Sequence, residues 1–174
     1  MRPGAEGTTA FLVTLWTYAG RPFFADRATA SLFCRTLAAL RQRLGFRVQA
    51  YVVLPDRVRI IMAANDQDPR WVQVIVQRLK SRFAREMNQR SGRLGLVWQD
   101  ADQRQLLGDR REIAKRAELL HQYPVLARLA RHPGEWRYSS FRAWRGGLHG
   151  PVPIDLPERS SPAPAPRAPE RRLT

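Results

Sequence analysis

The chain has 174 residues, of which 30 are Lys or Arg and 15 are Asp or Glu, so its formal net charge is +15. This excess favours a polyanionic partner, and nucleic acid is the first to consider. With 44% hydrophobic residues the chain can form one core of ordinary size, and its length excludes two large domains. Only Lys80 and Lys115 are lysines. Nearly all of the positive charge is therefore guanidinium, which binds phosphate through a planar pair of donors.

The single cysteine, Cys34, has no partner for a disulfide within the chain. No apolar run approaches the roughly 20 residues that span a bilayer, and residues 1–9 lack the apolar core of a signal peptide. We therefore expect a cytoplasmic, nucleoid-associated protein with no membrane partner. In such a protein Cys34 is expected to be a buried helix residue rather than a nucleophile.

The first part of the chain predicts a strand followed by a helix. Residues 9–18 are mostly apolar and β-branched, which suits a strand buried on both faces. Asp26 is a good N-cap, and Gly45 is a good helix stop. Between them apolar residues recur at three- and four-residue spacing, at Ala30, Phe33, Cys34, Leu37, Leu40 and Leu44. We expect a helix that packs this stripe into the core.

Two further strands are predicted at residues 46–54 and 58–64. Only the short connection 55–57 separates them, so they should pair as a β-hairpin.

The second half of the chain predicts a helix, a short strand and another helix. The second helix has an apolar stripe over residues 71–87, and the glycine-containing segment 91–95 ends it. Residues 96–99 are expected to form a short last strand. A third helix should run over residues 109–123, with Pro124 closing it.

The order β-α-β-β-α-β predicts a ferredoxin-like α+β sandwich with an additional C-terminal helix. We assign residues 9–156 to one domain and expect residues 1–8 to be flexible. Residues 157–174 alternate Pro, Ala, Ser and Arg with almost nothing to bury. They are expected to form a disordered tail.

Two arginines stand at alternate positions at the start of the third strand. Arg57 and Arg59 flank Val58, and the period of two along a strand places both side chains on one face of the sheet. Two guanidinium groups side by side would provide two phosphate-binding forks.

These arginines lie in a run that resembles a known motif. Residues 50–59 read Ala-Tyr-Val-Val-Leu-Pro-Asp-x-Val-x, where x is arginine. The run resembles the signature strand of the REP-associated tyrosine transposases, within the HUH single-tyrosine transposases. In that family the two x positions are histidines that bind a divalent metal.

Further segments are similar to the family in order and spacing. They are Leu79-Lys80-Ser81-Arg82-Phe83 with Asn88, Trp98-Gln99, Leu120-His121-x-x-Pro124-Val125 and Trp136-x-x-Ser139-Ser140-Phe141-Arg142. The third of these segments resembles the family's YIHxNPV segment. The resemblance covers residues 9–145 and implies a DNA partner.

The sequence departs from the family at the metal-binding and nucleophile positions. The family's chemistry uses a metal to polarise a phosphodiester while a tyrosine attacks phosphorus. Arg57 and Arg59 replace the two histidines, and a guanidinium has no lone pair for a cation. The family's tyrosine falls on Leu119, and the asparagine one turn later is Tyr123. We therefore expect the divalent metal and strand cleavage to be lost, with Tyr123 a packing residue rather than a substitute nucleophile.

The positive charge is expected to serve a nucleic-acid surface. Basic residues of the second helix coincide with family positions, and Trp98 is either a stacking platform for a base or a core residue. His121 is assigned no catalytic role. The predicted contact residues are Arg57, Arg59, Arg78, Lys80, Arg82, Arg85, Trp98 and Gln99.

These observations favour a catalytically inactive transposase homologue that binds single-stranded or hairpin DNA. One alternative is an active transposase with altered metal ligands such as Asp56, His121 or Gln99. Another is an RNA-binding or protein-interaction module, because ferredoxin-like sheets also bind RNA and a fold does not fix a function. The wider superfamily includes monomers and dimers, and the sequence is compatible with both.

Overall fold

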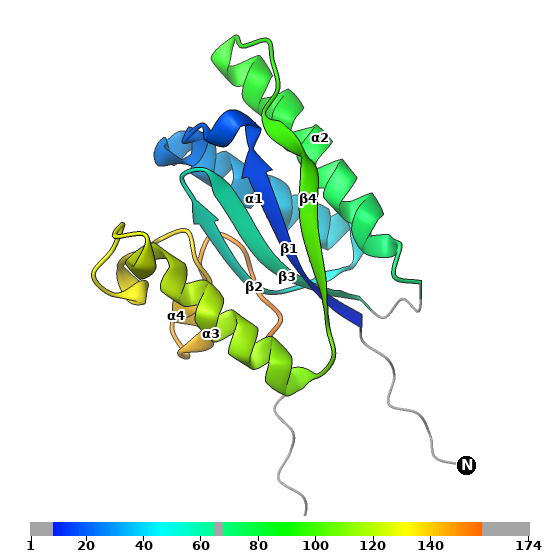
Figure 1. Ribbon diagram of the computed structural model, residues 1–174, viewed down its shortest axis with the longest axis vertical. Coiled ribbons are helices and arrows are strands. Elements are labelled where there is room, and N and C mark those ends of the chain that lie inside the picture. Colours follow the sequence, from blue (N-terminus) through cyan, green and yellow to red (C-terminus); the bar gives the residue numbers. More distant parts are fainter. Residues whose placement is uncertain (1–8, 65–67, 158–174) are drawn as a thin grey trace, which may run out of the picture.

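The computed structural model describes residues 9–64 and 68–157, which form a four-stranded antiparallel sheet with helices on both faces (Figure 1). The strands are β1 (Thr9–Thr17), β2 (Arg47–Leu54), β3 (Arg57–Ala64) and β4 (Trp98–Leu107), in the spatial order β2-β3-β1-β4. The helices are α1 (Arg27–Leu44), α2 (Trp71–Ser91), α3 (Arg110–Leu126) and the short α4 (Phe141–Trp144), with 3₁₀ turns at Tyr18–Gly20, Phe23–Ala25 and Pro133–Glu135. This arrangement confirms the predicted ferredoxin-like α+β fold.

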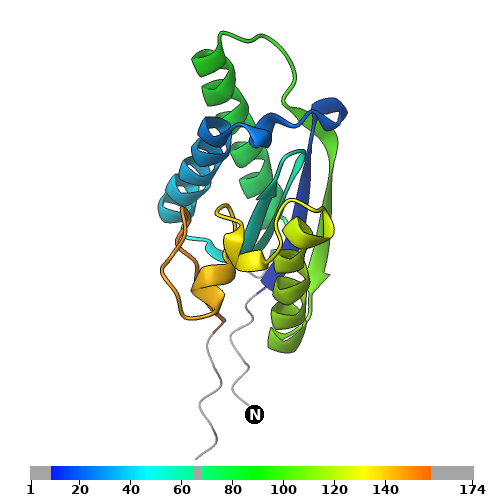
Figure 2. The same ribbon diagram turned by 90° about the vertical axis from the view of Figure 1, so that its left-hand side faces the viewer.

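Helices α1 and α2 cover one face of the sheet, called here the first face (Figure 2). Helix α1 begins where the Asp26 carboxylate accepts a hydrogen bond of 2.8 Å from the Thr29 backbone N–H, as predicted for an N-cap. It ends at Gly45, whose φ of 71° lies in the left-handed region. The predicted boundaries of this helix are therefore confirmed.

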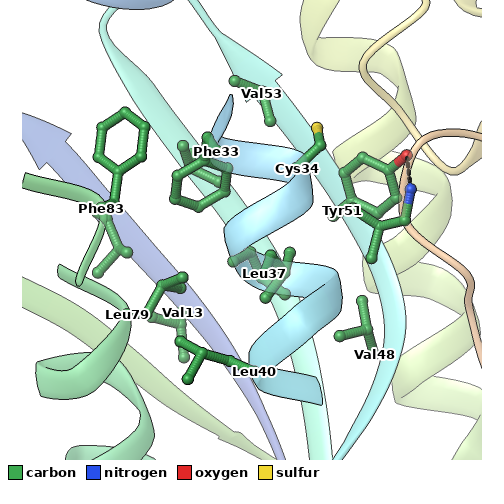
Figure 3. Close-up of a cluster of buried hydrophobic side chains, with 14 of the residues drawn as sticks. Val13, Phe33, Cys34, Leu37, Leu40, Val48, Tyr51, Val53, Leu79 and Phe83 are labelled. Carbon is green, nitrogen blue, oxygen red and sulfur yellow. Dashed lines mark hydrogen bonds between the residues drawn. The ribbon is translucent and has the colours of Figure 1, made fainter. Parts of the chain in front are cut away.

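The main core lies between these two helices and the sheet (Figure 3). It buries Val13, Phe33, Cys34, Leu37, Leu40, Val48, Tyr51, Val53, Leu79 and Phe83, among others. Burial of each large apolar side chain stabilises the fold by about 1.5–3 kcal/mol. Cys34 is buried in α1, as expected, and burial raises the pKa of its thiol to about 12, so the thiol is uncharged at neutral pH.

The opposite face of the sheet, called the second face, is covered over only part of its area. Helix α3 packs on it through Ile113, Ala117 and Leu120. These side chains meet apolar residues such as Val52 and Ile61. Beside the C-terminal end of α3 and across β1 to β4, the same face carries polar and charged side chains such as Arg57, Arg59 and Gln103. This open half of the second face is where the two arginines of the motif lie.

Two predicted boundaries are wrong. The last strand was expected at residues 96–99 but runs from Trp98 to Leu107. It is an edge strand whose residues are mostly exposed, so it lacks the apolar pattern on which the prediction depended. Pro124 was expected to close the third helix, yet α3 continues to Leu126. A proline within the last turn removes only one backbone hydrogen bond, and the Pro124 ring is buried.

The chain that follows α3 returns along the outer edge of β2. The Val53 backbone N–H donates to the Tyr138 carbonyl at 2.9 Å, and the Asp155 N–H donates to the Val48 carbonyl at 2.8 Å. The Asp155 carboxylate also accepts from Arg41 of α1 at 2.9 Å. The chain is thus attached to the folded domain as far as Asp155.

The predictions for residues 1–8 and for residues 158–174 of the tail lie outside the described residues. In the described part of the chain, no helix combines the length and apolar character needed to cross a membrane.

Candidate nucleic-acid interface

The β2–β3 hairpin places both motif arginines on the open half of the second face. Residues 55–56 form the turn, so Arg57 is the first residue of β3 and lies opposite Trp16 of β1. Arg59 lies opposite Thr14, while Val58 between them is buried in the core on the first face. The predicted placement of the two side chains on one face is therefore confirmed.

Each of the two guanidinium groups is held by neighbours. Arg57 donates to both carboxylate oxygens of Asp56, from Nε at 3.0 Å and from Nη2 at 2.9 Å. The Arg57 hydrogen bonds hold the pKa of Asp56 below its usual value, and the same contact raises the pKa of Arg57. The Asp56–Arg57 pair therefore stays charged at neutral pH.

Arg59 is positioned by an aromatic ring and a hydroxyl. Its Nε donates to Thr14 Oγ1 at 3.2 Å, and its guanidinium carbon lies 4.4 Å from the centroid of the Tyr123 ring. This is a cation–π contact between β3 and α3. The hydrogen bond to Thr14 uses one of the five N–H donors of Arg59, so within residues 9–64 and 68–157 donors remain for a ligand.

Helix α3 presents the two positions that the resemblance identifies with the family's tyrosine and asparagine. Leu119 is 48% exposed and carries no nucleophilic atom. Tyr123, one turn later, is half-buried, packs against the core of the second face and lies under Arg59. Its predicted packing role is confirmed, and its contact with Arg59 was not predicted.

Strand β4 adds two glutamines to the same face that sequence reasoning missed. Gln103 pairs with Thr14, and Gln105 pairs with Leu12, which belongs to the core under α3. Directly paired residues of antiparallel strands lie on the same face. Both amides therefore lie on the same face as the arginines, with β1 between β4 and β3. The last strand was expected to end at residue 99, so neither glutamine was predicted to lie on the sheet.

The second-helix arginines lie elsewhere. Arg78, Arg82 and Arg85 line a groove between α1 and α2, together with Arg43 of α1. That groove is on the helical layer of the first face, so the sheet separates it from Arg57 and Arg59 (Figure 2). From the sequence, these arginines were predicted to form one surface together with Arg57 and Arg59. In the structure they lie on two separate surfaces.

Lys80 and Trp98 attach the start of β4 to α2. The Lys80 ammonium donates to the carbonyls of Gln99 at 2.7 Å and Asp100 at 3.2 Å. The Trp98 indole N–H donates to the Lys80 carbonyl at 3.1 Å, and the side chain is 6% exposed.

The Trp98 ring lies 5.4–5.9 Å from the rings of Phe24, Phe33 and Phe83. Its role as a stacking platform for a base is therefore wrong, because its ring is enclosed by these core aromatics, and the core interpretation is confirmed. Gln99 itself is exposed.

The alternative metal ligands do not come together as a site. His121 is 3% exposed, and its Nε2 makes a 2.8 Å hydrogen bond with Ser140 Oγ. Burial, and to a lesser extent the charge of Arg145, lowers the pKa of His121 to about 4, so the ring is neutral. Asp56 is paired with Arg57. Within residues 9–64 and 68–157, no three His, Cys, Asp or Glu side chains converge in a way that could hold a metal ion.

A divalent cation does not fit the motif positions either. Arg57 and Arg59 offer only N–H donors and positive charge, which repel a cation and attract an anion. The donor set on the second face, two guanidiniums and two amides, suits a phosphate ester and the polar edge of a base. We call this surface, formed by Arg57, Arg59, Gln103, Gln105 and Tyr123, with the buried Thr14 hydroxyl beneath Arg59, the arginine face.

No family model and no curated protein matches this sequence. The solved structures with similar folds include two transposases. One is a REP-associated tyrosine transposase bound to a REP hairpin, with a TM-score of 0.62, 17% identity, and coverage of 92% of this chain and 93% of that one. The other is a candidate transposase from Deinococcus radiodurans R1, with a TM-score of 0.50, 19% identity, and coverage of 69% of this chain and 98% of that one. The chain thus has the fold of the REP-associated tyrosine transposases, as the motif resemblance implied.

Proposed function

We propose that this protein is a transposase-like DNA-binding protein without strand-cleavage chemistry, and that it engages single-stranded or hairpin DNA through the arginine face. The observation that carries the proposal is the pair Arg57 and Arg59. Both guanidiniums lie on the open half of the second face, at the positions where the resemblance places metal-binding histidines. The REP-associated tyrosine transposase described above is bound to a REP hairpin, which supports the class of partner.

The geometry of the arginine face suits phosphates. Residues two apart on a strand are separated by about 7 Å, so Arg57 and Arg59 can each contact a different phosphate. Tyr123 supports Arg59 from below, which lowers the entropy that the guanidinium loses on binding. The amides of Gln103 and Gln105 can donate to and accept from base edges.

The same residues argue against cleavage. A phosphodiester cut by an attacking tyrosine requires charge stabilisation at phosphorus and a nucleophile in reach. The guanidiniums can stabilise charge, but Leu119 supplies no nucleophile. The Tyr123 ring is engaged with Arg59, and no divalent metal fits beside them. We therefore propose binding with no turnover and with no cofactor.

The test is the affinity of R57A/R59A for a labelled DNA hairpin and for a labelled single strand. We expect binding at least about tenfold weaker than wild type, because two charge-assisted contacts to phosphate are lost. The slope of log K against log salt should fall by about 1.4 for a single strand and by about 1.8 for a duplex. The matched control R35A/R90A removes two exposed arginines outside both surfaces and should change affinity less than threefold. Unchanged affinity of R57A/R59A would contradict the proposal.

Two further measurements belong to this test. Competition with an RNA hairpin of the same sequence separates a DNA partner from an RNA partner, and stronger binding of the RNA would favour the RNA-binding alternative. Incubation of the protein and hairpin with Mn²⁺, followed by a denaturing gel, should give no covalent adduct. An adduct that disappears in Tyr123→Phe would show that cleavage chemistry survives.

A further inference from the structure

A groove between α1 and α2 is lined mainly by positively charged and polar side chains. It has a volume of about 900 Å³. Its charged lining consists of Arg43, Arg78, Arg82, Arg85 and Glu86. The rest of its lining is polar or aliphatic, from Leu40, Leu44, Gln77, Ser81 and Gln89. We call it the helical groove.

The positive charge of the helical groove is mostly unbalanced. Arg82 is paired with Glu86 at 2.9 Å, and the Glu86 carboxylate also lies 3.4 Å from the Thr36 hydroxyl. In the described part of the chain, no carboxylate lies within ion-pair distance of Arg78 or Arg85, which are both exposed. An anion would therefore meet guanidiniums with free donors.

The spacing of these arginines matches a nucleic-acid backbone. Arg78, Arg82 and Arg85 follow one another at four- and three-residue steps, so they lie in a row along one side of α2. Seven residues of helix rise by about 10 Å. Measured along the axis of a duplex, this length corresponds to about three nucleotides of one strand. A row of this kind binds a backbone without reading its sequence.

The helical groove and the arginine face lie on opposite sides of the sheet. Helices α1 and α2 form the layer on the first face, whereas Arg57 and Arg59 belong to the second face (Figure 2). A packed helix is about 10 Å thick, so the sheet and one helical layer separate the two surfaces. A short duplex resists the bend that would bring it around both, since the persistence length of DNA is about 150 base pairs.

We infer that one chain holds two nucleic-acid segments at once, one on the arginine face and one in the helical groove, and thereby bridges them. This inference rests on the proposed function for its first site and adds a second site of different character. The arginine face takes a single strand or hairpin end. The helical groove takes a phosphate backbone of any sequence.

The experiment measures energy transfer between two DNA hairpins, one with a donor dye and one with an acceptor dye, mixed with the full chain at low ionic strength. We expect transfer with wild type, and light scattering should give one chain and two hairpins in the bridged complex. R78E/R85E should lose the transfer at least tenfold yet still bind one hairpin, because the arginine face is intact. R57A/R59A should also lose the transfer and retain weak, salt-sensitive binding. The control R35E/R90E carries the same charge change on exposed sites outside both surfaces and should retain transfer.

The contrary outcomes are distinct. Saturation at one hairpin per chain, or transfer that survives R78E/R85E, would overturn the second site and leave the proposed function standing. Transfer that arises only from complexes with two chains would also overturn it. If wild type binds no hairpin at all, the proposed function fails together with the inference. Circular dichroism of each variant confirms that the substitutions leave the fold intact.

Discussion

The arginine face and the helical groove carry the same side chain in two different settings. On the arginine face each guanidinium is positioned: Arg57 by the Asp56 carboxylate, and Arg59 by Thr14 and the Tyr123 ring. In the helical groove Arg78 and Arg85 extend from an exposed helix surface, and no carboxylate of the described residues pairs with them. A positioned cation loses little entropy on binding and favours one ligand geometry, whereas a solvated one attracts any phosphate. The comparison predicts a selective site and a general one on the same molecule.

The largest effect is expected from Trp98→Ala, which weakens the packing between the sheet, with its arginine face, and the helices that form the helical groove. Trp98 packs Phe33 of α1 and Phe83 of α2 against the sheet, so its removal leaves a cavity between the layers that carry the two surfaces. The free energy of unfolding should fall by about 3–5 kcal/mol in urea titrations. The neighbouring control Gln99→Ala changes an exposed side chain and should stay within about 0.5 kcal/mol of wild type. A Trp98→Ala loss below 1 kcal/mol would mean that the aromatic cluster tolerates the cavity.

Removal of the Tyr123 ring should leave the Arg59 guanidinium without its aromatic contact and more exposed to solvent. We expect Tyr123→Ala to weaken hairpin binding by about tenfold, which corresponds to about 1.4 kcal/mol, because the cation–π support is lost. Tyr123→Phe keeps the ring and should bind within about twofold of wild type. Equal losses in the two variants would assign the effect to the hydroxyl group instead.

The smallest effect on DNA affinity is expected when the Arg57 guanidinium is freed from the Asp56 carboxylate. Asp56→Asn removes the carboxylate that competes with a phosphate for the Arg57 guanidinium, so affinity for DNA should rise by about twofold to fourfold. A fall in affinity would mean that Asp56 is needed to orient Arg57.

The same pair predicts a dependence of stability on pH. The pKa of Asp56 is lower in the folded protein than its usual 3.8, so the pair stabilises the fold above that value. The stabilisation is lost as the pH falls through the folded-state pKa. Acid titration of wild type should therefore show a stability loss below about pH 4 that Asp56→Asn lacks. Identical acid profiles for the two proteins would contradict this contribution.

Much of the fold could be predicted because the relevant signals are local. The cap at Asp26 and the stop at Gly45 depend on backbone groups within one turn, and both were confirmed. The placement of Arg57 and Arg59 on one face depends only on the period of a strand. Strand β4 had no such signal, because an edge strand with polar residues on an open face lacks apolar alternation.

The composition of the site depended on tertiary structure and could not be predicted in full. The sequence shows that Arg78, Arg82 and Arg85 form a basic stripe, but not which layer of the sandwich the stripe faces. The contact between Arg59 and Tyr123 joins residues 64 positions apart in number, and only the packing of α3 on the sheet brings them together. Trp98 could be a surface platform or a core residue from the sequence alone, and its aromatic neighbours decide the matter.

The return of the chain along β2 has a consequence for colloidal behaviour. An unpaired edge strand is a template on which other chains can add strands, and repeated addition leads to fibrils. Here the backbone of β2 is already hydrogen-bonded to Tyr138 and Asp155, and Arg41 holds Asp155 in place. Sheet growth through β2 would first require this segment to detach. The segment that contains Tyr138 and Asp155 thus covers the β2 edge of the sheet and protects it from strand addition by other chains.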